Sequence, residues 1–262
     1  MMADLEGLTF GPKPLAVTAD RVAAYVVATG DDASRWIDHA PPGFASAALF
    51  VVAPDLLALL GGRSVVHGEQ TFDWLRPIGV GAVLRVVGTV TRYRERGGIV
   101  YVGFDLTAED DSGEVMKGTS LFLLSGDAPP LDTAPVEREP AHDDDGEPGA
   151  EERGASRAGL VRYAAATGDW NPVHWDHDSA VAAGFPGVVV HGLLQAAWAL
   201  QEASRHRFGP RPASSARFRF RAPLPPASPV KTTSGFEGEV LAVTIIDTAR
   251  EYLSARIELA DE

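Results

Sequence analysis

The sequence predicts an α+β fold in which each half of the chain wraps an antiparallel sheet around one long apolar helix. The first reason is an internal repeat: Tyr25–Asp31 and Tyr163–Asp169 share five identities in seven positions. The second is that an apolar, helix-forming run follows each copy. The third is that strand-like segments then follow in the same order in both halves. A unit of about 120 residues therefore occurs twice.

Two helices are expected in each half. Thr18 and Ser156 stand where the N-caps of the helices entering the two repeats should lie. Longer helices are expected over the apolar runs 44–60 and 192–204, the second of which is rich in good helix formers. Because both runs are largely apolar, we expect each to be the buried central helix of its half.

Strands follow each long helix. The segments alternate or run apolar and are rich in Val, Thr, Phe and Tyr, as strands are. They cover 64–76, 82–94, 98–109 and 114–124 in the first half, and 213–222, 229–240, 241–248 and 251–259 in the second. Gly97-Gly98 and Asp111–Gly113 are turn sequences between strands. Short turns between consecutive strands favour antiparallel sheets.

An acidic, proline-rich stretch separates the two halves. The 262 residues carry a net charge of −13, of which residues 125–153 contribute −8, with ten acidic residues, two arginines and five prolines. This composition is typical of a solvated linker. The predicted domains are therefore 1–124, the linker 125–153, and 154–262. The remaining charge of −5 indicates no particular partner, and we expect no nucleic-acid binding.

Composition predicts a cytoplasmic protein. The chain has no cysteine, so neither disulfides nor thiolate metal ligands are available. No apolar run approaches the roughly 18 residues needed to span a bilayer, so we expect no membrane partner. Residues 1–14 lack the basic region and apolar core of a secretory signal.

The loop after the second repeat carries groups suited to acid–base chemistry. Asp169, Asn171 and His174 lie within six residues, on a segment interrupted by Gly168 and Pro172. Such a segment cannot continue as regular helix, and polar groups on an irregular loop are well placed to meet a substrate. Imidazoles and carboxylates are natural proton carriers, because a neighbour or partial burial can place their pKa values near neutrality, whereas an amide cannot titrate. Asn171 is therefore expected to orient the other groups.

The first repeat lacks this constellation. His174 lies five residues after Asp169, but Trp36 lies five residues after Asp31, and His39 has the wrong spacing. We therefore expect one working site per chain, in the second half. The first half is expected to supply packing and a wall of the pocket.

The second half resembles the signature of MaoC-type (R)-specific enoyl-thioester hydratases, which have the hot-dog fold. The matching positions are Tyr163, Thr167–Asp169, Asn171-Pro172, His174, Asp176, Gly184–Pro186 and His191-Gly192. In the first half, His67–Gln70 ahead of Phe72–Pro77 resembles the companion amino-terminal dehydratase-like domain. The resemblance implies a double hot-dog: two antiparallel sheets, each wrapped around a long central helix, related by a pseudo-twofold axis. The chain would be a pseudo-dimer by itself, and a further homodimer stays open.

The resemblance also implies a reaction. The expected enzyme is a hydro-lyase that reversibly hydrates trans-2-enoyl thioesters of coenzyme A or acyl carrier protein to (R)-3-hydroxyacyl thioesters, without a cofactor. By resemblance, Asp169 and His174 hold and activate one water. The Gly192 N–H, at the start of a long helix, is expected to donate to the enolate oxygen, because unpaired N–H groups there favour negative charge.

Several nearby residues have a second interpretation. Asp176 is expected to cap a helix beginning near Ser179. His191 is expected to fix the local backbone, with proton transfer as the alternative. The run from His174 to Asp178 invites a metal interpretation, but its members point in successive directions and no distant ligands complete it. We expect no metal.

The basic stretch 205–221 has two interpretations. Arg205 and Arg207 are candidates for contacts with the phosphates of coenzyme A or with an acidic carrier protein. The alternative is a solvated face, since Phe218 and Phe220 share one side of a strand and the arginines share the other. At the level of function the alternatives are an acyl-thioesterase and a non-catalytic acyl-thioester-binding subunit, because fold alone does not fix the reaction.

Overall fold

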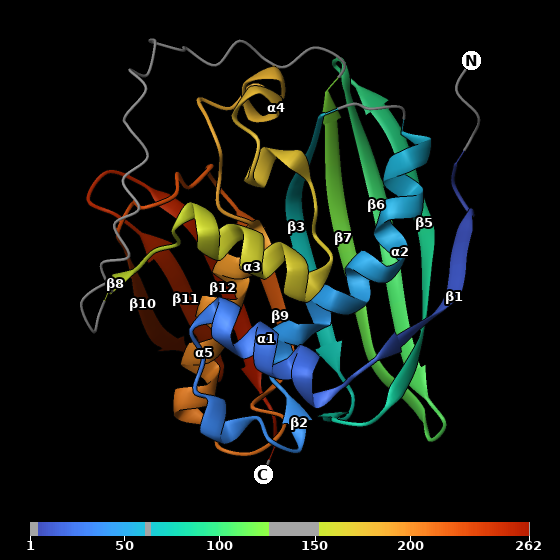
Figure 1. Cartoon of the computed structure of the whole chain (residues 1–262), viewed down its shortest axis with the longest axis vertical. Coiled ribbons are helices and arrows are strands. Elements are labelled where there is room, and N and C mark those ends of the chain that lie inside the picture. The colour runs from blue at the N-terminus through green and yellow to red at the C-terminus, as the bar shows by residue number, and fades with distance from the viewer. Residues whose placement is uncertain (1–4, 61–63, 126–151, 262) are drawn as a thin grey trace.

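The computed structural model in Figure 1 describes residues 5–60, 64–125 and 152–261. Most of the predicted linker 125–153 lies outside the described residues. A ten-stranded antiparallel sheet forms one layer, and the helices pack against one face of it (Figure 1). The expected duplicated architecture is confirmed.

Each half contributes five strands to the sheet. The first half supplies β1 (Thr9–Ala16), β3 (Ser64–Trp74), β5 (Val83–Arg96), β6 (Ile99–Asp110) and β7 (Gly113–Ser125). The second supplies β8 (Glu152–Arg153), β9 (Ala213–Phe220), β10 (Val230–Glu237), β11 (Val240–Ile246) and β12 (Glu251–Leu259). The order is β1-β5-β6-β7-β3-β9-β12-β11-β10-β8, and β2 (His39–Ala40) pairs separately with β4 (Ile78–Gly79). Outward from the centre, the two halves repeat the same order, as a pseudo-twofold axis requires.

The two half-sheets are joined at their inner edges. β3 and β9 pair antiparallel, from Glu69 opposite Arg219 to Asp73 opposite Ser215. Arg217 and Arg219 both form ion pairs with Glu69 across this junction. The expectation of two sheets is therefore refined to one continuous sheet, because each inner strand satisfies the unpaired backbone groups of the other.

The helices follow the predicted pattern. Their bounds are α1 (Ala19–Thr29), α2 (Ala45–Leu59), α3 (Arg157–Thr167), α4 (His177–Ala182) and α5 (Gly192–His206), with 3-10 turns η1 (Ala33–Arg35), η2 (Pro42–Phe44) and η3 (Pro172–His174). Thr18 and Ser156 cap α1 and α3 as expected, each hydroxyl accepting a backbone N–H three residues on. α2 and α5 are the central helices, packed on the strands of their own halves.

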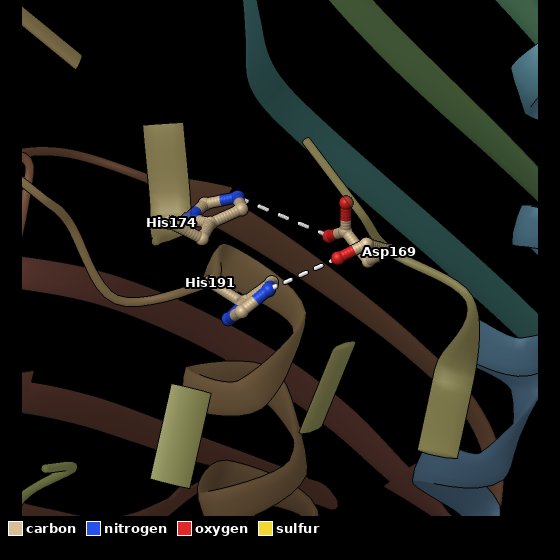
Figure 2. Close-up of side chains that lie close together, drawn as sticks. All are labelled: Asp169, His174 and His191. Atoms are coloured by element: carbon tan, nitrogen blue, oxygen red, sulfur yellow. Dashed lines mark hydrogen bonds and ion pairs between the residues drawn. The ribbon is translucent and has the colours of Figure 1, made fainter. Parts of the chain in front are cut away.

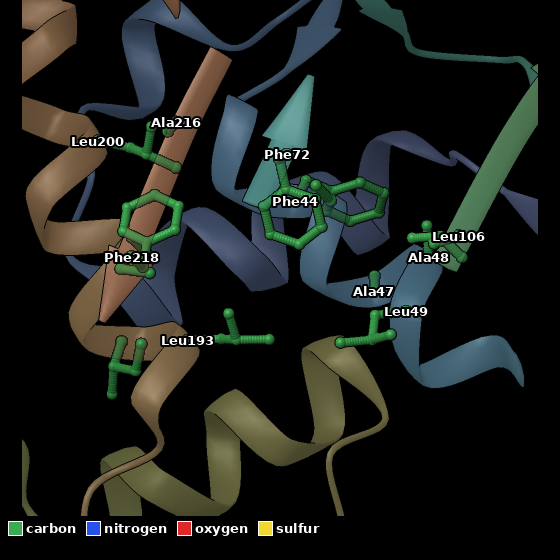
Figure 3. Close-up of a cluster of buried hydrophobic side chains, with 14 of the residues drawn as sticks. Phe44, Ala47, Ala48, Leu49, Phe72, Leu106, Leu193, Leu200, Ala216 and Phe218 are labelled. Carbon is green, nitrogen blue, oxygen red and sulfur yellow. The ribbon is translucent and has the colours of Figure 1, made fainter. Parts of the chain in front are cut away.

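The core is continuous between the halves. Figure 3 shows Phe44 and Leu49 from the first half near Leu193 and Phe218 from the second, all of them buried. The helices α1 and α3 lie side by side across the centre, with the rings of Tyr25 and Tyr163 6.1 Å apart. This packing fixes the position of the loop that follows each tyrosine helix.

One expectation about apolar runs was wrong. The helical stretch Pro42–Leu59 has 18 residues with a mean hydropathy of 1.7, which is long and apolar enough to cross a membrane by those measures alone. In the fold, 61% of the stretch is buried inside the protein. It contains the central helix of the first half, which is apolar because it packs against the sheet.

Candidate active site

A tight loop presents the acidic and imidazole side chains. α3 ends at Gly168, whose φ of 88° is a left-handed conformation that favours glycine, and its N–H closes on the Ala164 carbonyl. The chain then turns through η3, where Asn171 caps by accepting the Val173 N–H at 3.4 Å. Asp169 and His174 therefore lie at the two ends of one short turn.

Asp169 and His174 face each other inside the protein. The distance from Asp169 Oδ2 to His174 Nε2 is 3.9 Å (Figure 2), and the two residues are only 7% and 9% exposed. This distance is too long for a direct hydrogen bond. A small molecule such as water can reach both atoms at about 2.8 Å, the ordinary length of such bonds.

A backbone contact fixes the state of the imidazole. His174 Nδ1 lies 2.8 Å from the Val189 carbonyl oxygen. Because a carbonyl can only accept, Nδ1 carries the proton, and in the neutral ring Nε2 offers its lone pair toward Asp169. The arrangement makes Nε2 a proton acceptor directed into the space beside the carboxyl group.

Burial alters the proton affinity of Asp169. Desolvation raises the pKa of its carboxyl above the usual value, against the opposing effects of His174 and of the Asn171 N–H, which lies 3.4 Å from Oδ1. Asp169 therefore keeps a proton to higher pH than a solvated aspartate. Asn171 contacts the carboxylate through its backbone and caps the turn through its side chain.

His191 supports both residues from below. Its Nε2 lies 3.3 Å from the backbone oxygen of Asp169, and its ring stacks on that of His174 at 3.8 Å (Figure 2). The centroid of the Tyr163 ring lies 4.9 Å from that of His191. Burial and the neighbouring His174 lower the pKa of His191, which favours the neutral ring. His191 is therefore a neutral ring that contacts both ends of the turn, at the Asp169 backbone and at the His174 ring.

Asp169, His174 and His191 are also the one group of described residues whose side chains lie close enough together to hold a metal ion. Atoms of Asp169, His174 and His191 lie within 4.8 Å of one another. Ligands of a tetrahedral zinc ion stand about 2.0–2.2 Å from the metal, which needs closer spacing than the 3.9 Å between the first two. Asp176 is occupied as the cap of α4, accepting the Ser179 N–H at 2.7 Å, as expected. The expectation of no metal stays a prediction.

Gly192 begins α5 at the edge of the same space. The first N–H groups of a helix have no partner within it. A Cβ at Gly192 would come within 2.9 Å of the Phe220 ring, so only glycine allows β9 to approach here. The close approach explains a glycine at a position where helix propensity alone would favour alanine.

A cavity of about 180 Å³ connects these groups. Asp169, Asn171, His174 and Gly192 all line it. Its remaining lining is largely apolar and comes from both halves: Phe50, Leu57, Val65, Val66, His67 and Phe122 from the first, and Val173, Phe185, Val189, Val190, Leu193, Gln195, Phe220, Arg221, Ala222 and Pro223 from the second. As expected, the first half supplies a wall of the pocket.

The structure does not bring Arg205 and Arg207 to this cavity. They follow Gly192 by a whole helix, about 20 Å at 1.5 Å per residue. Arg205 pairs with Glu202 at 2.8 Å, and the Arg207 carbonyl accepts from Arg35. The arginine that lines the cavity is Arg221, from the same basic stretch. Arg221 comes directly after β9, and the sequence alone could not show that the end of this strand lies at the pocket.

Two hot-dog halves that share a cavity lined by a carboxyl group, an imidazole and a helix N-terminus define a double hot-dog protein with a candidate acid–base site among the described residues. The model of the MaoC like domain matches residues 141–255, and that of the FAS1-like dehydratase domain region matches residues 4–118. The chain therefore combines a FAS1-like dehydratase region in its first half with a MaoC-like domain in its second, and it is a dehydratase of the lyase class.

Individual relatives agree in sequence and fold. A curated relative, 3-hydroxyacyl-thioester dehydratase X of Mycobacterium tuberculosis, is 27% identical over 97% of this chain and 90% of its own length. The crystal structure of HtdX from that organism covers 97% of this chain and 100% of its own, with a TM-score of 0.74 and 22% identity. Another Mycobacterium tuberculosis protein, described as a double hotdog fold, covers 97% and 96% with a TM-score of 0.65 and 16% identity.

Proposed function

We propose that this enzyme reversibly hydrates trans-2-enoyl thioesters to (R)-3-hydroxyacyl thioesters. The observation that carries the proposal is the 3.9 Å gap between Asp169 Oδ2 and His174 Nε2 on the wall of a largely apolar cavity. The relative named 3-hydroxyacyl-thioester dehydratase X supports the substrate class. The apolar lining suits an acyl chain.

The two side chains have complementary roles in this proposal. In hydration, His174 Nε2 accepts a proton from the water while the water oxygen bonds to C3 of the enoyl group. Protonated Asp169, whose pKa is raised by burial, gives its proton to C2. The proton left on His174 then returns to Asp169 through a bound water or hydroxyl, which restores the pair. Dehydration follows the same steps in reverse.

The thioester oxygen carries negative charge while C2 is being protonated. The N–H of Gly192, at the N-terminus of α5, is the proposed donor to this oxygen. One such donor typically contributes a factor of about 10²–10³ in rate.

Stereochemistry follows from the position of the pair. Both Asp169 and His174 belong to one turn and meet one side of the cavity. Water and proton are therefore proposed to add to the same face of the double bond, and the (R) configuration of the product is proposed from the family resemblance. The thioester carrier, coenzyme A or a carrier protein, is proposed to lie toward Arg221, the one arginine among the lining residues described.

Crotonyl-CoA provides the test. Loss of the enoyl absorbance without release of free thiol supports hydration. Release of thiol would identify a thioesterase, and binding without either change would identify an acyl-thioester-binding subunit. An (S)-specific 3-hydroxyacyl-CoA dehydrogenase added afterwards should find no substrate, because the product has the (R) configuration.

A further inference from the structure

His67 is the one polar side chain that the described first half contributes to the cavity wall. The other lining residues from that half are Phe50, Leu57, Val65, Val66 and Phe122. Its ring lies between Phe122 and Phe220, with centroids 4.9 Å from each. His67 Nε2 is buried and has no hydrogen-bond partner among the described residues. A buried polar atom without a partner is unfavourable, so a partner supplied by a ligand would be favourable.

A β-bulge turns this imidazole into the cavity. Gln70, Phe72 and Trp74 of β3 are buried on the core side, so strict alternation would direct residue 68 inward and His67 outward. The pairing with β7 shifts register between His67 and Glu69, which places His67 opposite the buried Phe122. Gly68 is the extra residue, lying close against Leu123. Bulges next to active sites commonly re-aim a side chain in this way.

A second unpaired group lines the same cavity from the other half. Gln195 is 3% exposed, and its Oε1 has no hydrogen-bond partner among the described residues. It lies one helical turn after Gly192 on α5. The ring of Phe220 packs on His67 and also lies against Gly192. The two polar groups therefore lie close to the site of the reaction, on walls contributed by different halves.

We propose that His67 and Gln195 form a polar subsite that binds a neutral oxygen group, such as a hydroxyl, on the acyl chain of the substrate. Both side chains can exchange hydrogen bonds with a hydroxyl. Burial lowers the pKa of His67 to about 4, so the ring is neutral at physiological pH and does not attract a carboxylate. The inference rests on the proposed function, because it treats the cavity as the acyl-thioester site.

Binding of saturated thioesters tests the subsite without requiring turnover. The probes are octanoyl-CoA and its derivatives with a single hydroxyl at each position from the fifth carbon to the last. Wild-type protein should bind the best-placed hydroxyoctanoyl-CoA about tenfold or more tightly than octanoyl-CoA, by isothermal titration calorimetry. A hydroxyl that matches a buried polar group typically gives selectivity of this size or larger.

Variants identify the source of the selectivity. His67→Leu and Gln195→Met should each reduce the ratio of the two affinities toward one, mainly by weakening the binding of the hydroxyoctanoyl-CoA. Leu57→Ala is the matched control, because it enlarges the same wall without changing its polarity. It should weaken both ligands and leave the ratio unchanged.

Two other outcomes separate the proposals. If octanoyl-CoA binds and crotonyl-CoA is hydrated, but no hydroxylated chain binds better or His67→Leu leaves the ratio unchanged, the polar subsite is wrong and the hydratase stands. If no thioester binds or reacts, both proposals fail.

Discussion

The two loops that follow the tyrosine helices share a scaffold and differ in chemistry. Gly30 and Gly168 end α1 and α3 in the same left-handed conformation. Thr29 and Thr167 each donate a side-chain hydrogen bond to the carbonyl of the preceding tyrosine, at 3.0 and 2.8 Å. The repeated sequence therefore encodes the end of a helix.

The residues after each aspartate decide whether a site exists. Burial raises the pKa of Asp31 as it does that of Asp169. Asp31, however, borders a space of only about 10 Å³, and the buried Trp36 occupies the position that corresponds in sequence to His174. A carboxyl group at the end of the tyrosine helix is thus common to both halves, half-buried in the first and buried in the second. The candidate active site has, in addition, an imidazole and room for a substrate.

The largest expected effect contrasts these two aspartates. Asp169→Asn should lower kcat for crotonyl-CoA hydration by about 10³-fold or more, because the amide cannot exchange the proton. Asp31→Asn is the matched control and should keep nearly full activity. Equal loss in the two variants would contradict the assignment of one site per chain. Initial rates at saturating substrate check both.

Gly192 should give the next largest effect. Gly192→Ala puts a Cβ within 2.9 Å of the Phe220 ring, which displaces the N–H proposed to bind the thioester oxygen. We expect kcat to fall by about 100-fold. The double variant Gly192→Ala with Phe220→Leu should recover part of the loss, because the smaller side chain removes the clash. No recovery, in a protein that melts like the wild type, would argue against this role.

Asp169 should also lower stability at neutral pH. Its pKa is raised in the folded state, so its favourable contribution is complete below the unfolded pKa and is lost as pH rises through the folded pKa. Asp169→Asn should therefore raise the melting temperature at pH 7, and the gain should vanish toward pH 4.

Asp110 provides the opposite case. Hydrogen bonds from Arg76 lower the pKa of its carboxyl, so its contribution is present above the unfolded pKa and is lost as pH falls through the folded pKa. Asp110→Asn should lower the melting temperature at pH 7, with the loss fading in acid. If both substitutions changed the melting temperature at pH 7 in the same direction, the assigned directions of the two pKa shifts would be contradicted.

The smallest expected effect concerns the arginines. Arg221→Glu should raise KM for crotonyl-CoA severalfold with little change in kcat, because Arg221 lines the cavity and the carrier is anionic. Charge reversal at both Arg205 and Arg207 should leave both constants unchanged, since α5 separates them from the cavity. If charge reversal at Arg205 and Arg207 raised KM more than Arg221→Glu did, the carrier would bind at the far end of α5, as the sequence first suggested.

Local patterns predicted most of the fold and placed two residues of the candidate site in one turn. The caps Thr18 and Ser156, the central helices and the strands follow from periodicity and helix-capping chemistry, which act over a few residues. Asp169 and His174 were found because one short turn carries both.

Contacts between distant segments could not be predicted in this way. The Val189 carbonyl that fixes the His174 ring lies 15 residues away, and Phe220, which closes on Gly192, belongs to another element. The bulge at Gly68 reverses the alternation of β3, so the sequence alone would direct His67 outward. These features depend on register and packing, which a single sequence does not specify.

Hydration of crotonyl-CoA in D2O tests most directly whether one pair of side chains handles both protons. NMR coupling between the protons on C2 and C3 of the product shows the face to which deuterium was added relative to the hydroxyl. The proposal predicts syn addition, because Asp169 and His174 line one side of the cavity, and it predicts the (R) configuration at C3 from the family resemblance. Anti addition would require a proton donor on the opposite wall and would contradict the shared roles of Asp169 and His174.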